Sequence, residues 1–283
     1  MTEVTEVVSE GRVAVVTGAA SGIGLGLSER FAAEGMRVVM ADVEEPALKA
    51  AADRVAEGGA EVLPVVTDVS RADQVDALRD QTLSAFGAVH LLCNNAGVGG
   101  SHAPLWEIPL GEWEWILGVN LWGVVHGVRS FMPALLDADA AYLVNTASIF
   151  GAFAGALGPY GISKNAVVTL TETLHFQLED LGSPIGLSVL CPGPVKTNFA
   201  TSERNRPASA GPARVRDDRE QGARETFDQL WATGREPSEV ADIVVEGIRA
   251  RRFYLLTSTN RNEAVRRRGE QIVAGGPPTP PFP

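Results

Sequence analysis

Cysteine is scarce in this chain, with two among 283 residues, and no apolar run approaches a membrane-spanning length. A spanning helix needs roughly 20 consecutive apolar residues. The first eleven residues are acidic and lack the apolar core of a secretion signal. Cys93 and Cys191 each follow an apolar run, as small buried residues do in a reducing compartment. We therefore expect a cytoplasmic protein that does not enter a membrane.

Positive charge is scarce as well, because 24 basic residues are set against 35 acidic ones and leave a formal net charge of −11. Nucleic acids and anionic membrane surfaces favour basic proteins, so neither is an expected partner. The four histidines lack metal-binding spacing, so no metal site is predicted. The chain also lacks a Gly-x-Ser-x-Gly motif, which argues against a hydrolase.

Short apolar runs alternate with longer helical patterns along most of the chain. Val, Leu and Ile predict strands at residues 12–17, 36–41, 62–67, 89–94, 141–146 and 185–191. Helices are predicted at residues 22–34, 46–57, 71–86, 111–136 and 159–181. Nearly continuous apolar strands suit parallel strands that are covered on both faces. The alternation predicts an α/β protein with a doubly wound parallel sheet of the Rossmann type.

The pattern changes after the sixth predicted strand. Residues 201–220 are polar and have little periodicity, which predicts a substrate lid at about residues 198–232. A helix at 237–249, a last strand at 253–257 and a last helix at 260–273 follow. We expect one domain over residues 11–274, a flexible segment at 1–10 and a loose, proline-rich tail at 275–283.

A glycine-rich turn at residues 17–24 connects the first predicted strand to the first predicted helix. Gly18 would allow a tight turn, Gly22 would let the backbone approach a pyrophosphate, and Gly24 would let helix and strand pack closely. The helix N-terminus favours a negatively charged group. The alternative is a strand–helix loop that is merely rich in glycine, but the flanking elements favour a dinucleotide site.

Asp42 ends the second predicted strand, eighteen residues after Gly24. An acid at this distance can accept hydrogen bonds from the adenosine ribose and repel the 2′-phosphate of NADP. Ser21 and Val43 are uncharged, so no basic residue is apparent for that phosphate. The pattern favours NAD over NADP; the alternative is a solvated acid in an acidic turn.

Tyr160 and Lys164 stand four residues apart, and Ser148 precedes Tyr160 by twelve residues. Residues at i and i+4 share one helix face, so the Lys164 ammonium can lie near the Tyr160 phenol. A free Tyr titrates near ~10, and a neighbouring positive charge would lower this pKa enough for acid–base work. Alone, each residue has an ordinary structural explanation as an interface aromatic, a surface charge or a strand-end hydroxyl.

Taken in order, these motifs resemble the short-chain dehydrogenase/reductase family over residues 12–197, about two thirds of the chain. The matching positions are residues 17–24, Asp68-Val69, Asn94-Asn95-Ala96-Gly97, Asn120, Ser148, Tyr160, Lys164 and Pro192-Gly193. The interval between Ser148 and Tyr160 is one residue shorter than the family's, which suggests a trimmed loop over the substrate.

The resemblance implies a catalytic set in which Ser148 binds the substrate oxygen and Tyr160 exchanges its proton. Lys164 would lower the Tyr160 pKa and bind the nicotinamide ribose, while Asn120, at a break in a long helix, would hold a water that links Lys164 to solvent. The implied cofactor-binding residues are Gly18, Ser21, Gly22, Ile23, Gly24, Asp42, Asp68, Val69, Asn94, Ala96, Gly97, Tyr160, Lys164, Pro192, Gly193, Val195 and Thr197. Among them Asp68 would bind the adenine amine and Thr197 the nicotinamide carboxamide.

The expected function is hydride transfer between NAD and a small hydrophobic secondary alcohol or ketone. The alternatives are a noncatalytic NAD-binding regulator and an isomerase or dehydratase on the same fold. The family likeness also implies a homodimer or homotetramer. The C-terminal end lacks the glycine-containing strand typical of tetrameric members, and the long helices at 111–136 and 159–181 are the candidate dimer surface.

Overall fold

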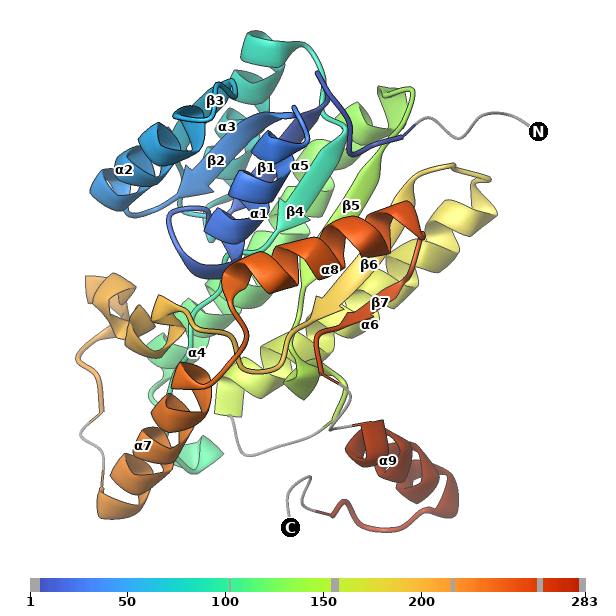
Figure 1. Ribbon diagram of the computed structural model, residues 1–283. Coiled ribbons are helices and arrows are strands. Elements are labelled where there is room, and N and C mark those ends of the chain that lie inside the picture. The colour runs from blue at the N-terminus through green and yellow to red at the C-terminus, as the bar shows by residue number, and fades with distance from the viewer. Residues whose placement is uncertain (1–5, 102, 154–157, 215–216, 259–261, 280–283) are drawn as a thin grey trace.

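The protein, seen in a computed structural model, has a central sheet between two layers of helices (Figure 1). Described here are residues 6–101, 103–153, 158–214, 217–258 and 262–279. The sheet has seven strands in the order β3-β2-β1-β4-β5-β6-β7, and every neighbouring pair is parallel. The strands are β1 (Val13–Thr17), β2 (Arg37–Asp42), β3 (Val62–Val66), β4 (Leu91–Asn94), β5 (Tyr142–Thr146), β6 (Gly186–Cys191) and β7 (Tyr254–Leu256). The predicted doubly wound sheet is confirmed.

The helices divide between the two faces of the sheet. The larger ones are α1 (Gly22–Ala33), α2 (Glu45–Ala56), α3 (Ala72–Phe86), α4 (Leu110–Leu117), α5 (Gly123–Asp137), α6 (Gly158–Asp180), α7 (Asp218–Ala232), α8 (Pro237–Arg249) and α9 (Asn262–Ala274). Helices α1, α2 and α8 share one apolar core with the strands, and α3, α5 and α6 share the core on the opposite face.

Strand β1 shows why both faces are covered. Ala14 and Val16 pack into the core of α1 and α8, whereas Val13 and Val15 pack into the core of α3 and α5. Successive side chains of a strand point to opposite faces, so a continuous apolar run requires helices on both sides. The same alternation explains the unbroken hydrophobicity that identified the strands in the sequence.

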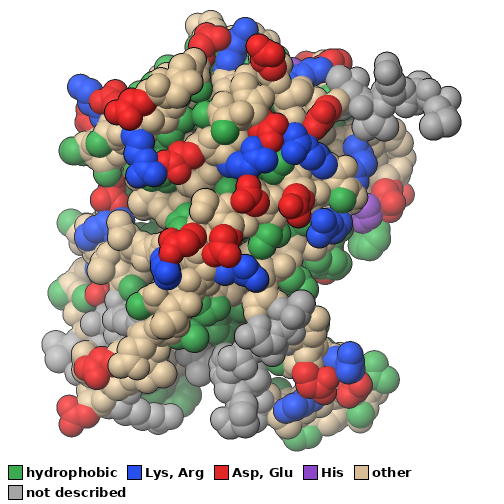
Figure 2. Space-filling view, viewed as in Figure 1, with side chains coloured by type: hydrophobic (Ala, Val, Ile, Leu, Met, Phe, Trp, Pro, Cys, Tyr) green, Lys and Arg blue, Asp and Glu red, His purple; other side chains and the backbone are tan. Residues whose placement is uncertain are grey.

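Helices α1 and α8 lie side by side on the face shown in Figure 2, where acidic and basic side chains are interspersed. Arg30 Nε donates to Asp242 Oδ1 at 2.8 Å, and Arg249 Nη2 donates to Glu34 Oε2 at 2.8 Å. The first pair joins α1 to α8, and the second joins Glu34, the residue after α1, to α8. Such exposed pairs contribute about 0–1 kcal/mol each, so the apolar core between the helices supplies most of the stability.

The structure differs in detail from some sequence expectations. The helix predicted at 111–136 is divided into α4 and α5 by a π-helical turn, η2 (Gly118–Trp122), so Asn120 lies at a break in a long helix, as the family resemblance implied. Val7 and Val8, which belong to the segment expected to be flexible, are buried in the core; residues 1–5 lie outside the described part.

The lid expected at 198–232 has more regular structure than its polar sequence indicated. It contains two 3₁₀ segments, η4 (Asn198–Asn205) and η5 (Ala208–Ala210), followed by α7. Helix α7 is strongly polar, and its partly buried Phe227 and buried Trp231 pack against one aromatic cluster. The anchoring residues among the described side chains of α7, Phe227 and Trp231, give too weak a period to be recognised from the sequence. Residues 215–216 of this lid, and 280–283 of the tail, lie outside the described part.

Two shorter 3₁₀ segments, η1 (Leu105–Glu107) and η3 (Ile149–Gly151), follow strands β4 and β5. Strand β7 forms the edge of the sheet, where Tyr254 is exposed and Leu255 is buried. Among the described residues, no helix is both long and apolar enough to span a bilayer.

Candidate active site

A cleft crosses the carboxyl ends of the parallel strands and contains about 1360 Å³ of empty space, including the part that opens to solvent. It lies where the strand order reverses, because β2 and β3 lie on one side of β1 and β4 lies on the other. Ligands bind at this point in sheets of this type. Its lining extends from Asp42 and Asp68 at one end to Ser148 and Tyr160 at the other, so one elongated ligand can contact both ends.

The glycine-rich turn forms the floor of the cleft, and at Gly18 and Gly22 its backbone lies too close to its neighbours for a side chain. Gly18 and Gly22 have φ of +66° and +55°, in the left-handed region that favours glycine. A Cβ on Gly18 would lie 2.8 Å from the Ala96 Cα, and one on Gly22 would lie 2.8 Å from the Thr197 Cγ2. The turn therefore presents bare backbone at the start of α1, as a pyrophosphate requires.

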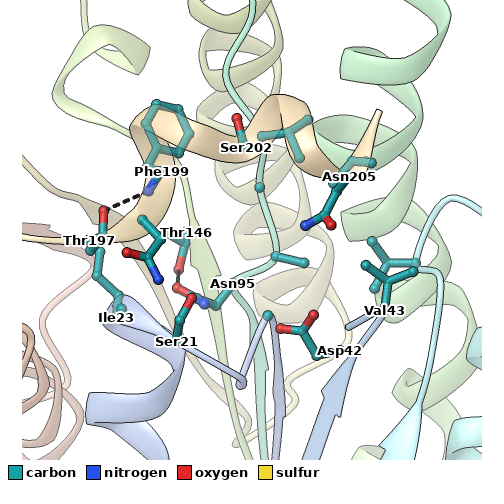
Figure 3. A pocket seen from close by; sticks show the side chains of 18 of the residues that line it. Ser21, Ile23, Asp42, Val43, Asn95, Thr146, Thr197, Phe199, Ser202 and Asn205 are labelled. Atoms are coloured by element: carbon teal, nitrogen blue, oxygen red, sulfur yellow. Dashed lines mark hydrogen bonds between the residues drawn. The ribbon is translucent and has the colours of Figure 1, made fainter. Parts of the chain in front are cut away.

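Hydrogen bonds tie this turn to the chain after β4. The Thr17 Oγ1 accepts from the backbone N–H of Asn95 at 2.9 Å and of Ala96 at 3.1 Å, and the Asn95 Nδ2 donates to the Thr17 carbonyl at 3.0 Å. Figure 3 shows Asn95 beside Ser21 on the floor of the pocket. The two segments thus hold each other in place across the sheet.

Asp42 stands at the end of β2 with both carboxylate oxygens engaged by backbone. The Oδ2 accepts from Ala20 N–H and the Oδ1 from Glu44 N–H, each at 3.0 Å. Burial raises the pKa of Asp42, and the backbone hydrogen bonds oppose the rise. Asp68 lies nearby in the lining, where its Oδ1 accepts from the backbone and hydroxyl of Ser70.

We expected no basic residue near Asp42, and that expectation is wrong. Arg204, in η4, lines the cleft and donates from its Nη2 to the Glu44 Oε1 at 2.6 Å. The hydrogen bond from Arg204 lowers the pKa of Glu44. Because 160 residues separate the two partners, only the folded chain brings this cation to the site.

At the opposite end of the cleft, Ser148, which follows β5, converges with Tyr160 and Lys164 of α6. Their side chains are buried, with residue exposures of 3%, 8% and 3%. The Lys164 Nζ donates to the Thr146 carbonyl at 2.9 Å and lies 5.9 Å from the centre of the Tyr160 ring. Ser148 forms a side-chain hydrogen bond with Tyr160 and accepts one from the Phe150 N–H.

The electrostatics of this cluster differ from the sequence expectation. Burial raises the pKa of Tyr160 to about 12, against the lowering effect of its hydrogen bond with Ser148. Burial also lowers the pKa of Lys164 to about 8. We expected Lys164 to lower the Tyr160 pKa, but removal of both groups from water has the larger effect here.

Asn120 lies in the π-helical turn, directly behind this cluster, and is fully buried. Its Oδ1 accepts from the Val98 N–H at 2.8 Å, and its Nδ2 donates to the Val98 carbonyl and the Ser163 Oγ. A Cβ on Gly97 would lie 3.3 Å from the Lys164 Nζ and 3.4 Å from the Asn120 Oδ1. The missing side chain of Gly97 thus leaves space between the lysine and the asparagine.

Aromatic side chains close the cleft beside Tyr160. The Phe199 ring lies 5.1 Å from the Tyr160 ring, and the rings of Phe227 and Trp231 stack at 3.6 Å, measured between centroids. Phe150 and Phe153, which the sequence suggested as pocket residues, belong to the same cluster but lie behind the cleft surface. This end of the cleft is therefore apolar around the hydroxyl groups of Ser148 and Tyr160.

Most of the predicted site residues line this one cleft. Those on its surface are Gly18, Ser21, Gly22, Ile23, Asp42, Asp68, Val69, Ala96, Gly97, Ser148, Tyr160, Lys164, Pro192, Gly193, Val195 and Thr197. Gly24, Asn94 and Asn120 lie behind it. Gly24 packs against the turn, where a Cβ would come within 2.1 Å of the Gly18 carbonyl oxygen, and the Asn94 Nδ2 donates to the Asn145 Oδ1.

Sequence reasoning missed the lid residues that complete the lining, chiefly Ser202, Arg204 and Asn205. The Ser202 Oγ accepts from the Gly99 N–H at 2.9 Å, which seats η4 on the chain after β4. Figure 3 shows Phe199, Ser202 and Asn205 on the opposite side of the pocket from Ser21 and Asp42. Ser202, Arg204 and Asn205 form no local motif, so the polar composition of this segment was the only available signal.

Comparison with known proteins agrees with this geometry. The short chain dehydrogenase family matches residues 12–208, so the chain belongs to that family. A crystal structure of a short chain dehydrogenase/reductase from Burkholderia phymatum in complex with NAD is 44% identical, with a TM-score of 0.93, and the alignment covers 97% of this chain and 98% of that one.

Curated relatives carry the same class of activity. The 1-deoxy-11-beta-hydroxypentalenate dehydrogenase of Streptomyces avermitilis is 38% identical over 92% of this chain and 88% of its own. The CLA biosynthesis dehydrogenase/reductase of Lactiplantibacillus plantarum is 34% identical over 94% and 95%. The chain is thus an oxidoreductase that acts on hydroxyl groups with a nicotinamide cofactor.

Proposed function

We propose that this enzyme transfers hydride between NAD and a hydrophobic secondary alcohol or ketone, with Tyr160 as the general acid and base. The convergence of Ser148, Tyr160 and Lys164 at the apolar end of the cleft, whose other end is lined by the glycine-rich turn and Asp42, carries this proposal. The bare backbone at Gly18 and Gly22 supports the cofactor assignment, because a dinucleotide needs such a cradle for its pyrophosphate.

NAD would lie along the cleft, with its adenosine near Asp42 and Asp68 and its nicotinamide near Lys164 and Thr197. When bound, it accepts or supplies the hydride. Asp42 favours NAD, because an ionised carboxylate accepts hydrogen bonds from ribose hydroxyls and repels a 2′-phosphate. The NAD complex of the Burkholderia phymatum relative supports use of a nicotinamide cofactor.

Tyr160 would move the proton in either direction. In oxidation its phenolate accepts the proton of the substrate hydroxyl, while Ser148 donates a hydrogen bond to the same oxygen. A phenol with a pKa raised to about 12 is a poor base at neutral pH, so Lys164 must stabilise the phenolate when the cleft is filled. Asn120 would position the polar groups behind Lys164 through its bonds to Val98 and Ser163.

The substrate class follows from the aromatic wall. Phe199 and Trp231 line the cleft beside Tyr160, and no basic residue other than Lys164 and Arg204 lines its described part. An apolar alcohol or ketone would bury its carbon skeleton against these rings and direct its oxygen to Ser148 and Tyr160. The name of the hydroxypentalenate relative is consistent with a hydroxyl on a largely hydrocarbon skeleton.

The decisive experiment measures NADH formation with a panel of hydrophobic secondary alcohols, followed by the variant Tyr160→Phe. We expect kcat to fall by roughly 10²–10⁴-fold in Tyr160→Phe, the usual contribution of a positioned acid or base. Tyr254→Phe is the matched control, because Tyr254 is exposed and its hydroxyl contacts Glu172 instead of the cleft. Near-normal turnover in Tyr160→Phe would refute the assigned role.

A further inference from the structure

The cleft carries opposite charges at its adenosine end. Asp42, at the end of β2, and Glu44, two residues later, lie on one wall, and Arg204 of η4 lies on the other. Among the described lining residues the only other cation is Lys164, which is held at the catalytic end by the Thr146 carbonyl. Arg204 is therefore the cation available to a phosphate near Asp42.

The guanidinium of Arg204 is fully engaged in this structure. Its Nε lies 3.1 Å from both oxygens of Glu44, and its Nη2 lies 2.6 Å from the Glu44 Oε1. Its Nη1 donates to the Asn198 carbonyl and to the Thr201 Oγ1 within η4. The forked pairing with Glu44 uses the same donor geometry that arginine offers to a phosphate.

We propose that Glu44 is a specificity-determining residue, which favours NAD by keeping Arg204 from the 2′-phosphate of NADP. Asp42 and Glu44 then act by different means. Asp42 repels the phosphate directly, whereas Glu44 neutralises the one cation that could attract it. This inference rests on the proposed use of NAD and names a second residue behind that preference.

The pair also ties η4 to the start of α2, since Asn205 Nδ2 donates to the Glu44 Oε1 at 2.8 Å. If the pair only held η4 in place over the cofactor, its loss would change the dissociation constants for NAD and NADP by the same factor. If the pair determines specificity, its loss changes the ratio of the two dissociation constants.

The experiment is a titration of the full chain with NAD and with NADP. Binding is measured by the quenching of intrinsic tryptophan fluorescence, because Trp115 and Trp231 line the cleft. Glu44→Gln keeps the size of the side chain and removes its charge. No side-chain capping bond from Glu44 to α2 is lost, because the structure has none at this described helix start. We expect Glu44→Gln to shift the ratio of the two dissociation constants toward NADP by on the order of tenfold, one charge-assisted contact.

Three further variants complete the test. Glu44→Gln/Arg204→Gln should lose the gain for NADP, because the freed cation is gone. Arg204→Gln alone should weaken NADP binding more than NAD binding, because Glu44 then faces the phosphate unneutralised. Glu45→Gln is the matched control: it removes the same charge from the adjacent, exposed residue outside the cleft lining, and it should leave both dissociation constants unchanged.

An unchanged ratio in Glu44→Gln, or equal changes for both cofactors, would overturn the inference. If the unaltered protein bound NAD and NADP equally, the proposed NAD preference would fail instead. The ratio shift caused by Glu44→Gln would still report on Arg204, so the two failures can be told apart.

Discussion

Arg206 and Glu112 form an ion pair that is almost wholly removed from water, with side-chain exposures of 7% and 2% and 3.1 Å between Nη1 and Oε2. The guanidinium also lies over the Trp115 ring, 5.5 Å from its centre, and donates to the carbonyls of Ala210 and Gly211. The other oxygen of Glu112 accepts from the Ser101 N–H. One buried pair thus joins the lid, α4 and the chain after β4.

Arg206→Met should lower the free energy of unfolding by about 3–5 kcal/mol, because it leaves the Glu112 charge buried without its partner. Denaturant unfolding followed by circular dichroism measures this change. Arg71→Ala is the control: the pair of Arg71 with Asp73 is well exposed, and its loss should give no measurable change. Equal stability of the two variants would contradict the structural role of Arg206.

Gly97→Ala should reduce kcat/KM by about tenfold while the fold is retained. The new Cβ would enter the space between the Lys164 Nζ and the Asn120 Oδ1, at 3.3 and 3.4 Å, and displace one of them. Steady-state kinetics with the substrate found in the alcohol screen tests this expectation. Gly269→Ala, in exposed helix α9 with nothing within 4 Å of its Cβ, should be kinetically silent. Activity equal to that of the unaltered enzyme would show that this space is not used.

Lys164→Met should make the protein more stable at pH 7, by up to about 3 kcal/mol, because the buried ammonium is destabilising there. Burial lowers the Lys164 pKa from 10.5 to about 8, and each pKa unit corresponds to about 1.4 kcal/mol. Between pH 8 and 10.5 the unfolded chain binds this proton and the folded chain does not, so stability of the unaltered protein rises with pH.

The advantage of Lys164→Met should therefore shrink as the pH rises from 8 to 10.5. Above pH 10 Tyr160 has the opposite effect: burial raises its pKa to about 12, so the unfolded chain loses the phenol proton first and stability falls. Unfolding free energies measured from pH 7 to pH 11 test both signs. A constant difference between the variant and the unaltered protein would contradict the buried charge.

We predict that the protein assembles through α6 into a homodimer or a homotetramer. Ile162 and Phe176 on this helix are exposed, at 45% and 62%, which is costly for apolar side chains in water. Light scattering after size-exclusion chromatography should give a multiple of the 29.9 kDa chain mass, and Phe176→Glu should lower it. Val273→Glu is the control, because Val273 is 90% exposed on α9. A monomeric mass for the unaltered protein would refute the prediction.

The sheet could be predicted because its signals are local. Six strands were found from continuous apolar runs, within two residues of their observed ends, and the weaker seventh run at 253–257 is indeed strand β7. The family resemblance implied a break in helix 111–136 at Asn120, but the apolar spacing alone did not reveal it, because the π-helical turn at Gly118–Trp122 keeps the helical spacing of its apolar residues. The Asn120 side chain is held at that turn by two hydrogen bonds with the backbone of Val98, which lies 22 residues away in the chain.

The candidate site was predictable where short motifs fix backbone conformation or the helical spacing of side chains. Gly18 and Gly22 have the positive φ that their positions in the turn required, and Tyr160 and Lys164 share one helix face in the same cleft. The electrostatics were not predictable, because a pKa depends on burial. The sequence suggested a lowered Tyr160 pKa, and desolvation raises it instead.

The amino-acid sequence by itself determined the order of strands and helices, the backbone-lined turn and the three polar groups of the catalytic end. Tertiary structure alone decided which ion pairs residues 198–232 form with the rest of the chain. Arg204 meets Glu44 across 160 residues, and Arg206 meets Glu112 across 94, and neither pair leaves a periodic or local trace in the chain. The reason is physical: an ion pair depends on distance and solvent exposure in the folded state, and both quantities arise only when remote segments pack together.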